Sequence, residues 1–396
     1  MEQALNGGPA FADAFVERFV VEPAAEAAAA GPLRGFRFAV KDLFDVAGRH
    51  TGCGNPAWRS THGVAAANAE MVRILLHAGA RLVGTTRTDE LAYSLDGSNV
   101  HEGAPINPAA PERLTGGSSS GAASATASGS VEFAIGTDTA GSVRVPAAWC
   151  GLVGMRPTHG RLPVAGLTAL APSFDTVGWF APSAAMLRAV GAVFFPDDIA
   201  AAPAALIRDP ALDRYVGEPV AAAMGTMMER CAASGLPVAA ASLGIDLGAA
   251  AQCLRVLQAA EAWRTHGRWI ESVRPNFGPG VAERFEFARA VTAEEVRRAG
   301  AERAAVQARL DAVLPPGRIL CLPTVPGPAP RRDASPYQLQ SQRAQLLPLT
   351  ALASLTGRPQ ITLPLPANGA APTGFSLLGW RNGDAALLEA VRLLNP

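Results

Sequence analysis

A run of small residues at positions 115–142, TGGSSSGAASATASGSVEFAIGTDTAGS, encloses one short apolar segment. In other settings, a composition rich in Gly, Ser and Ala is typical of a flexible linker. Here residues 131–138 have the pattern of a strand, and small side chains flank that strand on both sides. Small side chains let backbones approach closely, so we interpret the run as part of a packed site within a folded domain.

The segments around this run alternate between strand and helix. Residues 36–47 and 81–86 are predicted strands, and residues 66–80 between them have the apolar spacing of a helix that ends near Gly79. Later strands are predicted at 318–330, which ends in a Pro-rich loop, at 359–365 and at 375–380. This order is typical of an α/β fold with a largely parallel or mixed sheet.

Residues 183–312 differ from both ends of the chain, because they form long Ala- and Arg-rich stretches with helical spacing. We therefore expect a single domain over residues 1–396. Its sheet core would come from about 30–182 and 313–396, with a helical variable segment at about 183–312.

The charge balance argues against some classes of partner. Lys+Arg and Asp+Glu are each 34, so the formal net charge is zero. Nucleic acid and anionic membranes attract a basic excess, so neither is expected as the main partner. We find no long apolar window for a membrane span and no N-terminal signal peptide. The five scattered cysteines form no CxxC pair, which predicts reduced thiols in a cytoplasmic protein without a zinc site.

One count within the basic residues is more informative than the totals. The chain has 33 arginines and a single lysine, Lys41. An ammonium group can lose its proton when it is buried, whereas a guanidinium effectively cannot. Lys41 is therefore a candidate for proton transfer. Chance, or a buried ion pair with Asp42 or Asp45, would explain the lysine equally well.

Several short motifs are absent or weak. The only lysine follows a valine, so the chain contains no Walker A loop. Residues 117–121 match the GxSxG pattern and would nominate Ser119 as a nucleophile. That elbow needs a strand–Ser–helix setting and a histidine base, and neither His159 nor His266 lies in a recognisable setting.

What remains is Lys41, the Gly-Gly-Ser-Ser-Ser-Gly loop and a second Gly-Ser in GTDTAGSVRVPA. Together these resemble the amidase signature family, which are serine hydrolases with a Ser–cis-Ser–Lys triad. The resemblance covers 115–160 and 36–48, and more loosely 173–181 and 322–330. It implies the family's α/β/α sandwich, in which helices flank a central mixed β-sheet.

The resemblance assigns a role to each triad position. Lys41 corresponds to the general base, Ser142 to the nucleophile and Ser118 to the serine that bridges them. The family's cis peptide bond would then join Gly117 and Ser118.

The resemblance also implies an oxyanion hole made of the backbone N–H groups of Thr139, Ala140, Gly141 and Ser142. Ala140 departs from the family, which usually has glycine there. A methyl group is tolerated if Ala140 keeps a negative φ, so we expect the hole to persist.

This chemistry has definite requirements. A serine hydroxyl needs a base within hydrogen-bond reach, and a free lysine with a pKa of about 10.4 must be buried before it can act as one. The expected activity is hydrolysis of a small carboxylic amide through a Ser142 acyl-enzyme, with Ser118 relaying the proton to Lys41. Asp138 and Arg144 are expected to brace the loop as a structural ion pair.

Two other functions stay open at this stage. The chain could be an amidotransferase subunit that passes ammonia to a partner, or a non-catalytic amidase-like binding module. A homodimer is also left open, and no metal or organic cofactor is implied.

Substrate identity is less constrained. The segments 173–181, 257–270 and 322–330 resemble the subgroup that contains plant indole-3-acetamide amidases, which implies an aryl- or alkyl-type small amide. Four aromatic residues could line an acyl pocket or belong to the core: Phe44, Trp149, Phe174 and Trp179.

Overall fold

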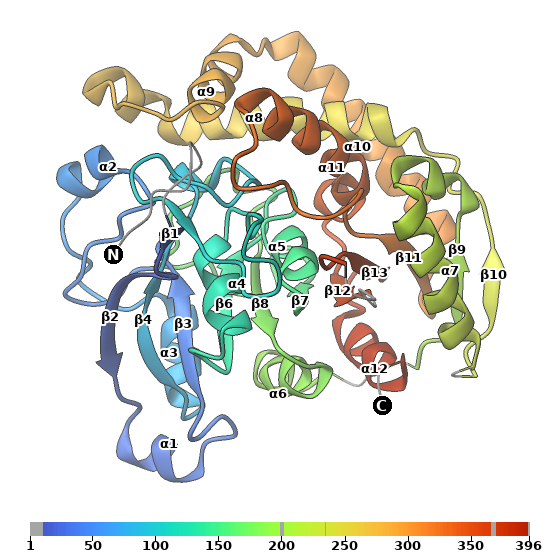
Figure 1. Ribbon diagram of the computed structural model, residues 1–396, viewed down its shortest axis with the longest axis horizontal. Helices are drawn as coiled ribbons and strands as arrows, with labels where there is room; N and C mark the ends of the chain where they lie inside the picture. The colour runs from blue at the N-terminus through green and yellow to red at the C-terminus, as the bar shows by residue number, and fades with distance from the viewer. Residues whose placement is uncertain (1–10, 199–201, 234, 366–369, 395–396) are drawn as a thin grey trace.

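The computed structural model describes residues 11–198, 202–233, 235–365 and 370–394 (Figure 1). In these residues eleven strands form one sheet, and a separate two-stranded pair accompanies it. In sheet order the strands are β10 (Val238–Ala240), β9 (Ala205–Arg208), β11 (Arg318–Pro323), β13 (Gly374–Leu378), β12 (Gln360–Pro364), β7 (Val153–Arg156), β8 (Val177–Ala181), β6 (Phe133–Thr137), β3 (Arg37–Lys41), β4 (Arg81–Thr86) and β2 (Phe15–Val21). The separate pair consists of β1 (Phe11–Ala12) and β5 (Ala104–Pro105).

The sheet is mixed. β3 runs parallel to both of its neighbours, β4 and β6, and β9 runs parallel to β10 and β11. The strands between these two groups pair in antiparallel fashion. Parallel neighbours need long crossover connections, and helices supply them. This confirms the predicted α/β fold with a central mixed sheet flanked by helices.

Helices pack on both faces of the sheet (Figure 1). One layer contains α3 (Glu70–His77), α6 (Ala184–Phe194), α7 (Glu218–Ala233) and α12 (Asp384–Leu394). The other contains α5 (Arg144–Trp149), α8 (Leu247–Val273), α9 (Val281–Ala290), α10 (Ala293–Val313) and α11 (Pro336–Thr356). Successive strand residues point to opposite faces, so Ile319 packs with the first layer and Leu320 with the second.

The remaining helices are short. They are α1 (Ala25–Ala30), α2 (Pro56–Thr61) and α4 (Ser120–Ala127), with 3₁₀ turns at Glu90–Ala92 and Pro210–Tyr215. α4 begins inside the small-residue run, and its alanines pack against β6 in a third apolar cluster. The run is therefore packed within the domain, as the sequence predicts, and is not a linker; its helix α4 was not predicted.

The predicted limits of the sheet are too narrow. β2 lies before residue 30, and the segment at 183–312 contributes β9 and β10 in addition to its helices. β9 is a four-residue strand in an Ala-rich stretch, and pairing with β11 stabilises it. Local periodicity cannot reveal such a strand, because its partner lies far away in the sequence. The single-domain organisation stays a prediction.

Elsewhere the elements follow the sequence pattern closely. β4 has the predicted limits, and β12 and β13 lie within one residue or two of theirs. α3 is shorter than the predicted helix at 66–80, and Gly79 follows its last turn with φ +91°. The turn-rich segment at 151–181 also contains two strands, β7 and β8, that the sequence analysis did not identify.

Among the described residues, no helix combines the length and apolar character needed to cross a bilayer. The signal-peptide expectation rests on residues 1–20, of which residues 1–10 lie outside the described part of the chain.

Candidate active site

Lys41 is the last residue of β3, and its side chain is completely buried. Its Nζ lies 2.7 Å from Ser118 Oγ and 2.9 Å from Thr137 Oγ1. Thr137 ends β6, which runs parallel to β3, so the two strands end at the same edge of the sheet. Thr137 is not among the predicted site residues, although its place at the end of a predicted strand is a usable signal.

Burial changes the protonation of Lys41. Desolvation lowers the pKa of this ammonium to about 7, against the opposing charges of Asp89, Asp175 and Asp138. A substantial share of Lys41 is therefore neutral near neutral pH and able to accept a proton.

The alternative ion pairs of Lys41 do not form. No carboxylate in the described part of the chain lies within 4.0 Å of its ammonium. Asp42 accepts instead from the N–H of Gly52, at 3.1 Å, and Asp45 accepts from the Thr51 hydroxyl, at 2.6 Å. The ammonium group of Lys41 therefore makes its hydrogen bonds to Ser118 and Thr137.

The loop before α4 positions Ser118. The Gly117–Ser118 peptide bond is cis, as the resemblance implies. The carbonyl oxygen of Ser118 accepts from the Asp89 N–H at 3.2 Å, and the Gly117 N–H donates to Leu95 at 2.9 Å. A Cβ at position 117 would lie 2.2 Å from Asp89 Oδ2, so only glycine fits there. Ser118 is held from both sides and has no contact with solvent.

Ser142 lies on the loop between β6 and α5, next to this site. The carbonyl oxygen of Ser142 accepts from the N–H of Ser119 at 3.3 Å. Because Ser119 follows Ser118 in the chain, this bond holds the Ser142 loop close to Ser118. The Ser142 side chain is almost fully buried, and its hydroxyl makes no hydrogen bond to any described residue. The structure therefore gathers all three predicted triad residues at one end of β3 and β6.

Asp138 braces the Ser142 loop, as predicted. Its carboxylate accepts from the side chain of Arg144 at 2.8 and 2.9 Å and also contacts Arg156. It accepts from the N–H groups of Gly141 and Val143 as well. Burial alone would raise the pKa of Asp138, but the two guanidinium groups hold it well below its usual range. Asp138 thus stays ionised and fixes the backbone on both sides of Ser142.

One of the four expected oxyanion donors is already used. The Gly141 N–H donates to Asp138 Oδ1 at 2.9 Å, so it is not free for a substrate. The N–H groups of Thr139, Ala140 and Ser142 have no acceptor among the described residues. The φ angle of Ala140 is not positive, whereas that of Gly141 is +131°. The backbone at position 140 therefore accommodates the methyl group of alanine. The conformation that requires glycine lies at position 141.

The GxSxG interpretation of Ser119 is wrong. The Ser119 hydroxyl donates to the carbonyl of Thr137 at 3.1 Å and accepts from its N–H at 3.2 Å. His159 and His266 contact backbone carbonyls of Pro172 and Ala169 instead. Burial lowers the pKa of His266 to about 4, so this imidazole is neutral and packed.

The four aromatic candidates are all packed in the interior. Trp149 donates to the Gly327 carbonyl at 2.9 Å and packs beneath Gly116. Trp179 packs against Phe194 of α6 within the first apolar cluster. Phe44 and Phe174 belong to the two main apolar clusters. These side chains are core residues in this structure.

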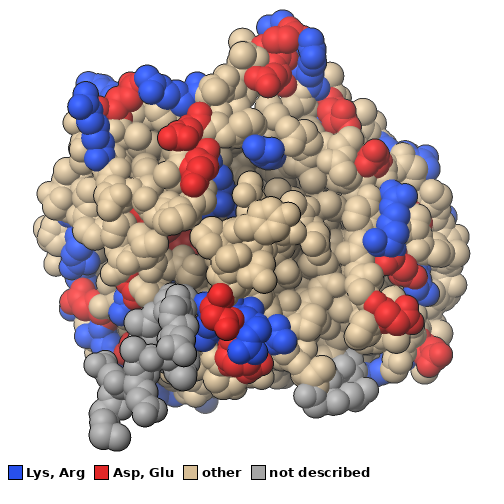
Figure 2. Space-filling model, turned by 45° about the horizontal axis from the view of Figure 1, so that its top comes forward, with Lys and Arg blue, Asp and Glu red and all other residues tan. Residues whose placement is uncertain are grey.

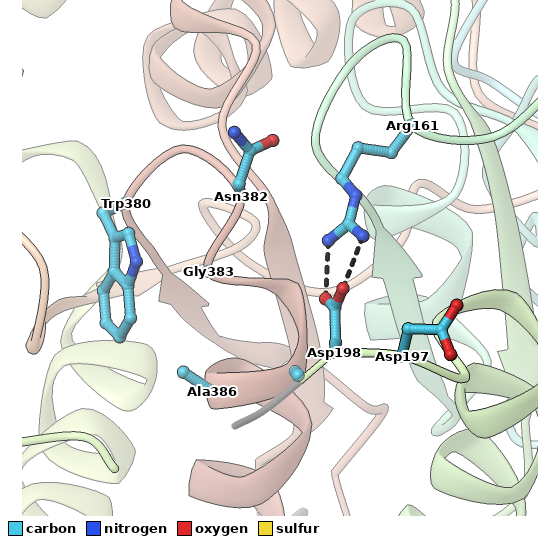
Figure 3. A pocket seen from close by; sticks show the side chains of 8 residues that line it. Arg161, Asp197, Asp198, Trp380, Asn382, Gly383 and Ala386 are labelled. Carbon is cyan, nitrogen blue, oxygen red and sulfur yellow. Dashed lines mark hydrogen bonds and ion pairs between the residues drawn. The ribbon is translucent and has the colours of Figure 1, made fainter. Parts of the chain in front are cut away.

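A separate cavity of about 600 Å³ lies where the segment after β7 meets α12 (Figure 3). Arg161 reaches across it to Asp198, with two hydrogen bonds of 2.7 Å. Trp380 and Asn382 line the same cavity. It contains none of the triad residues. In the described part of the chain, no three His, Cys, Asp or Glu side chains are placed to hold a metal ion.

Comparison with known proteins agrees with this geometry. The model of the family described as Amidase matches residues 19–388. The chain belongs to the amidase family. It is 37% identical to "Amidase 1" of Arabidopsis thaliana, over 96% of this chain and 96% of that protein. It is 31% identical to "Translocon at the outer membrane of chloroplasts 64" of Pisum sativum, over 92% of this chain and 66% of that protein.

Solved structures agree as well. A protein described as "Crystal structure of amidase" superimposes with a TM-score of 0.83 at 30% identity, over 92% of this chain and 85% of that chain. Family membership makes this chain an enzyme of the amidase class, with the α/β fold of its structural neighbours.

Proposed function

We propose that this amidase hydrolyses a small carboxylic amide to an acid and ammonia or an amine, through an acyl-enzyme on Ser142. The observation that carries the proposal is the buried contact of 2.7 Å between Lys41 Nζ and Ser118 Oγ. A neutral lysine hydrogen-bonded to a serine is a base with a proton relay already in position.

The proton path follows from this contact. Ser142 Oγ attacks the amide carbonyl and passes its proton to Ser118, whose own proton moves to Lys41. The tetrahedral intermediate then collapses, and the departing nitrogen takes the proton back through Ser118. In the second half of the reaction, a water molecule acts as the nucleophile and gives its proton to Lys41 through Ser118. Ser142 Oγ then leaves with a proton returned by the same path, which releases the acid and restores the triad.

The oxyanion needs donors that point at it before the reaction begins. The free N–H groups of Thr139, Ala140 and Ser142 are the candidates for this role. The N–H of Gly141 contributes indirectly, since its bond to Asp138 holds the loop in shape. Each donor directed at the oxyanion is worth about 3 kcal/mol of transition-state stabilisation.

A serine-directed probe tests the proposal before any substrate is known. Wild-type protein is treated with a fluorophosphonate, and the adduct is located by intact mass and peptide mapping. We expect one adduct on Ser142, with none in Ser142→Ala and a much slower reaction in Lys41→Ala. An adduct on another serine contradicts the assignment, and no adduct at all favours a binding module.

The finer substrate assignment needs its own assay. An aryl- or indole-acetamide-type acyl group stays a prediction, because the four aromatic candidates lie in the core. Hydrolysis of indole-3-acetamide and phenylacetamide should be compared with that of short aliphatic amides. Ammonia release by the purified chain alone, without a partner protein, argues against an amidotransferase subunit. The cytoplasmic location and the homodimer also stay predictions.

A further inference from the structure

The threonine at the start of the Ser142 loop is held through its side chain. Thr139 Oγ1 donates to Asp175 Oδ1 at 2.7 Å, and both residues are buried. The antiparallel strands β6 and β8 pair Thr137 with Val177, and the same register places Thr139 opposite Asp175. The contact therefore extends the pairing of two strands into the loop that carries the proposed nucleophile.

The second carboxylate oxygen of Asp175 is also occupied. Asp175 Oδ2 accepts from the N–H groups of Leu170 and Ala171, at 2.8 and 2.9 Å. A carboxylate that accepts from three donors is fixed in orientation, because a rotation of the group weakens these directional bonds. Asp175 therefore presents Oδ1 to Thr139 in a fixed position.

The segment that contains Asp175 is fixed in turn by two long helices. Glu261 of α8 accepts from the N–H and the hydroxyl of Ser173, at 2.8 and 2.5 Å. Arg303 of α10 donates to the carbonyl oxygen and the hydroxyl of Ser173, each at 3.1 Å. Both helices lie at the top of Figure 1, on the side that Figure 2 brings forward, where a hollow opens between acidic and basic side chains. The helical layer thus supports the residue that holds Thr139.

This anchor leaves the backbone N–H of Thr139 available. That N–H has no acceptor among the described residues, whereas the N–H of Gly141 already donates to Asp138. A donor stabilises a developing negative charge best when its direction is fixed before the reaction, because no reorientation is then needed. A residue with an anchored side chain and a free N–H meets this requirement.

We propose that Asp175 is a positioning residue for the oxyanion hole, which holds the Thr139 hydroxyl so that the Thr139 N–H points at the oxyanion. The inference rests on the proposed function and adds a residue outside the triad and the Ser142 loop. Asp138 holds the same loop through the N–H groups of Gly141 and Val143. The two carboxylates therefore support different parts of the hole.

The test compares variants that differ in one hydroxyl group. Thr139→Val removes the hydroxyl and keeps the shape of the side chain, whereas Thr139→Ser keeps the hydroxyl. The measured quantity is the second-order rate constant for fluorophosphonate labelling of Ser142. Burial lowers the pKa of Lys41 and the charge of Asp175 opposes that shift. Labelling is therefore measured at about pH 9, where the lysine is neutral in every variant.

We expect Thr139→Val to be labelled at least about tenfold more slowly, since loss of one oxyanion donor costs about 10²–10³-fold and a displaced donor loses part of that. Thr139→Ser should recover most of the loss. On any amide that the wild-type enzyme hydrolyses, Thr139→Val should lower kcat and leave KM nearly unchanged, because an oxyanion donor acts in the transition state.

Thr176→Val is the matched control, because the buried hydroxyl of Thr176 donates to the carbonyl oxygen of Phe174 at 3.0 Å in the same segment. Its labelling rate should match that of the wild type. Equal rates in wild type and Thr139→Val overturn the inference. An equal loss in Thr176→Val also overturns it, because that loss would indicate only a loosened segment.

Two further outcomes are separable. If Thr139→Val does not fold, Thr139→Ala removes the same hydroxyl without a methyl group against Asp175, and its rate is interpreted in the same way. If the wild-type protein forms no adduct on Ser142, the proposed function fails and this inference fails with it. A wild-type adduct with no effect of the threonine variants contradicts the role of Asp175 alone.

Discussion

The backbone N–H of Asp89 donates to the carbonyl oxygen of Ser118 at 3.2 Å, and the Asp89 carboxylate lies against Gly117. This acidic residue therefore shapes the loop that carries Ser118 and also acts electrostatically on Lys41. Burial raises the pKa of Asp89 to about 7, so the carboxyl and the lysine titrate in the same range.

Lys41→Arg should be nearly inactive although the positive charge is retained. An arginine cannot become neutral near pH 7, so it cannot accept the proton that Ser118 relays. The expected loss in kcat/KM is about 10²–10⁴-fold, measured on any amide that the wild-type enzyme hydrolyses. Thermal melting should show that the variant is folded. Wild-type rates in a folded Lys41→Arg protein would remove Lys41 from the mechanism.

The pH–rate profile should rise through neutrality. The pKa of Lys41 is lowered to about 7 by burial, so the protonated lysine dominates below that pH and the neutral base above it. kcat/KM should therefore be low in acid and reach a plateau above about pH 8. A profile that falls between pH 6 and pH 8 would contradict the role of a neutral lysine.

Asp89→Asn should shift the rising limb of that profile to lower pH. The negative charge of Asp89 raises the pKa of Lys41, and asparagine removes the charge while keeping the size and the backbone N–H. The neutral lysine then forms at lower pH. The pH–rate profiles of the two proteins are compared on one substrate. If the midpoint of the rising limb is the same in both proteins, the charge of Asp89 does not act on Lys41. If Asp89 has only a structural role, the rate should fall at every pH and the midpoint should not move.

Asp138→Asn should destabilise the fold. The carboxylate neutralises the buried guanidinium groups of Arg144 and Arg156, and asparagine leaves both without a counter-charge. Loss of one partner from a buried ion pair costs about 3–5 kcal/mol of unfolding free energy, measured by chemical denaturation.

A matched control for Asp138→Asn comes from Asp197→Asn, because Asp197 is exposed at the cavity of Figure 3. Its effect should stay within about 0.5 kcal/mol. Equal stability of wild type and Asp138→Asn would mean that the charge network contributes nothing to the fold.

Much of the site could be predicted from the sequence because its chemistry lies in continuous segments. The single lysine and the run from Gly116 to Ser142 indicate the family without any knowledge of contacts, and they supply the proposed triad positions. Strand and helix periodicity also predicts β4, β12 and β13 closely, since each has its own apolar pattern.

The remaining features depend on contacts between residues that are distant in the sequence. The amino-acid sequence by itself places the chain in the amidase family and predicts its α/β fold. Only the tertiary structure decides that Thr137 holds Lys41, that Asp138 occupies the Gly141 N–H, and that β9 joins the sheet beside β11. Periodicity describes which way a side chain points along one element, whereas these contacts depend on how separate elements pack.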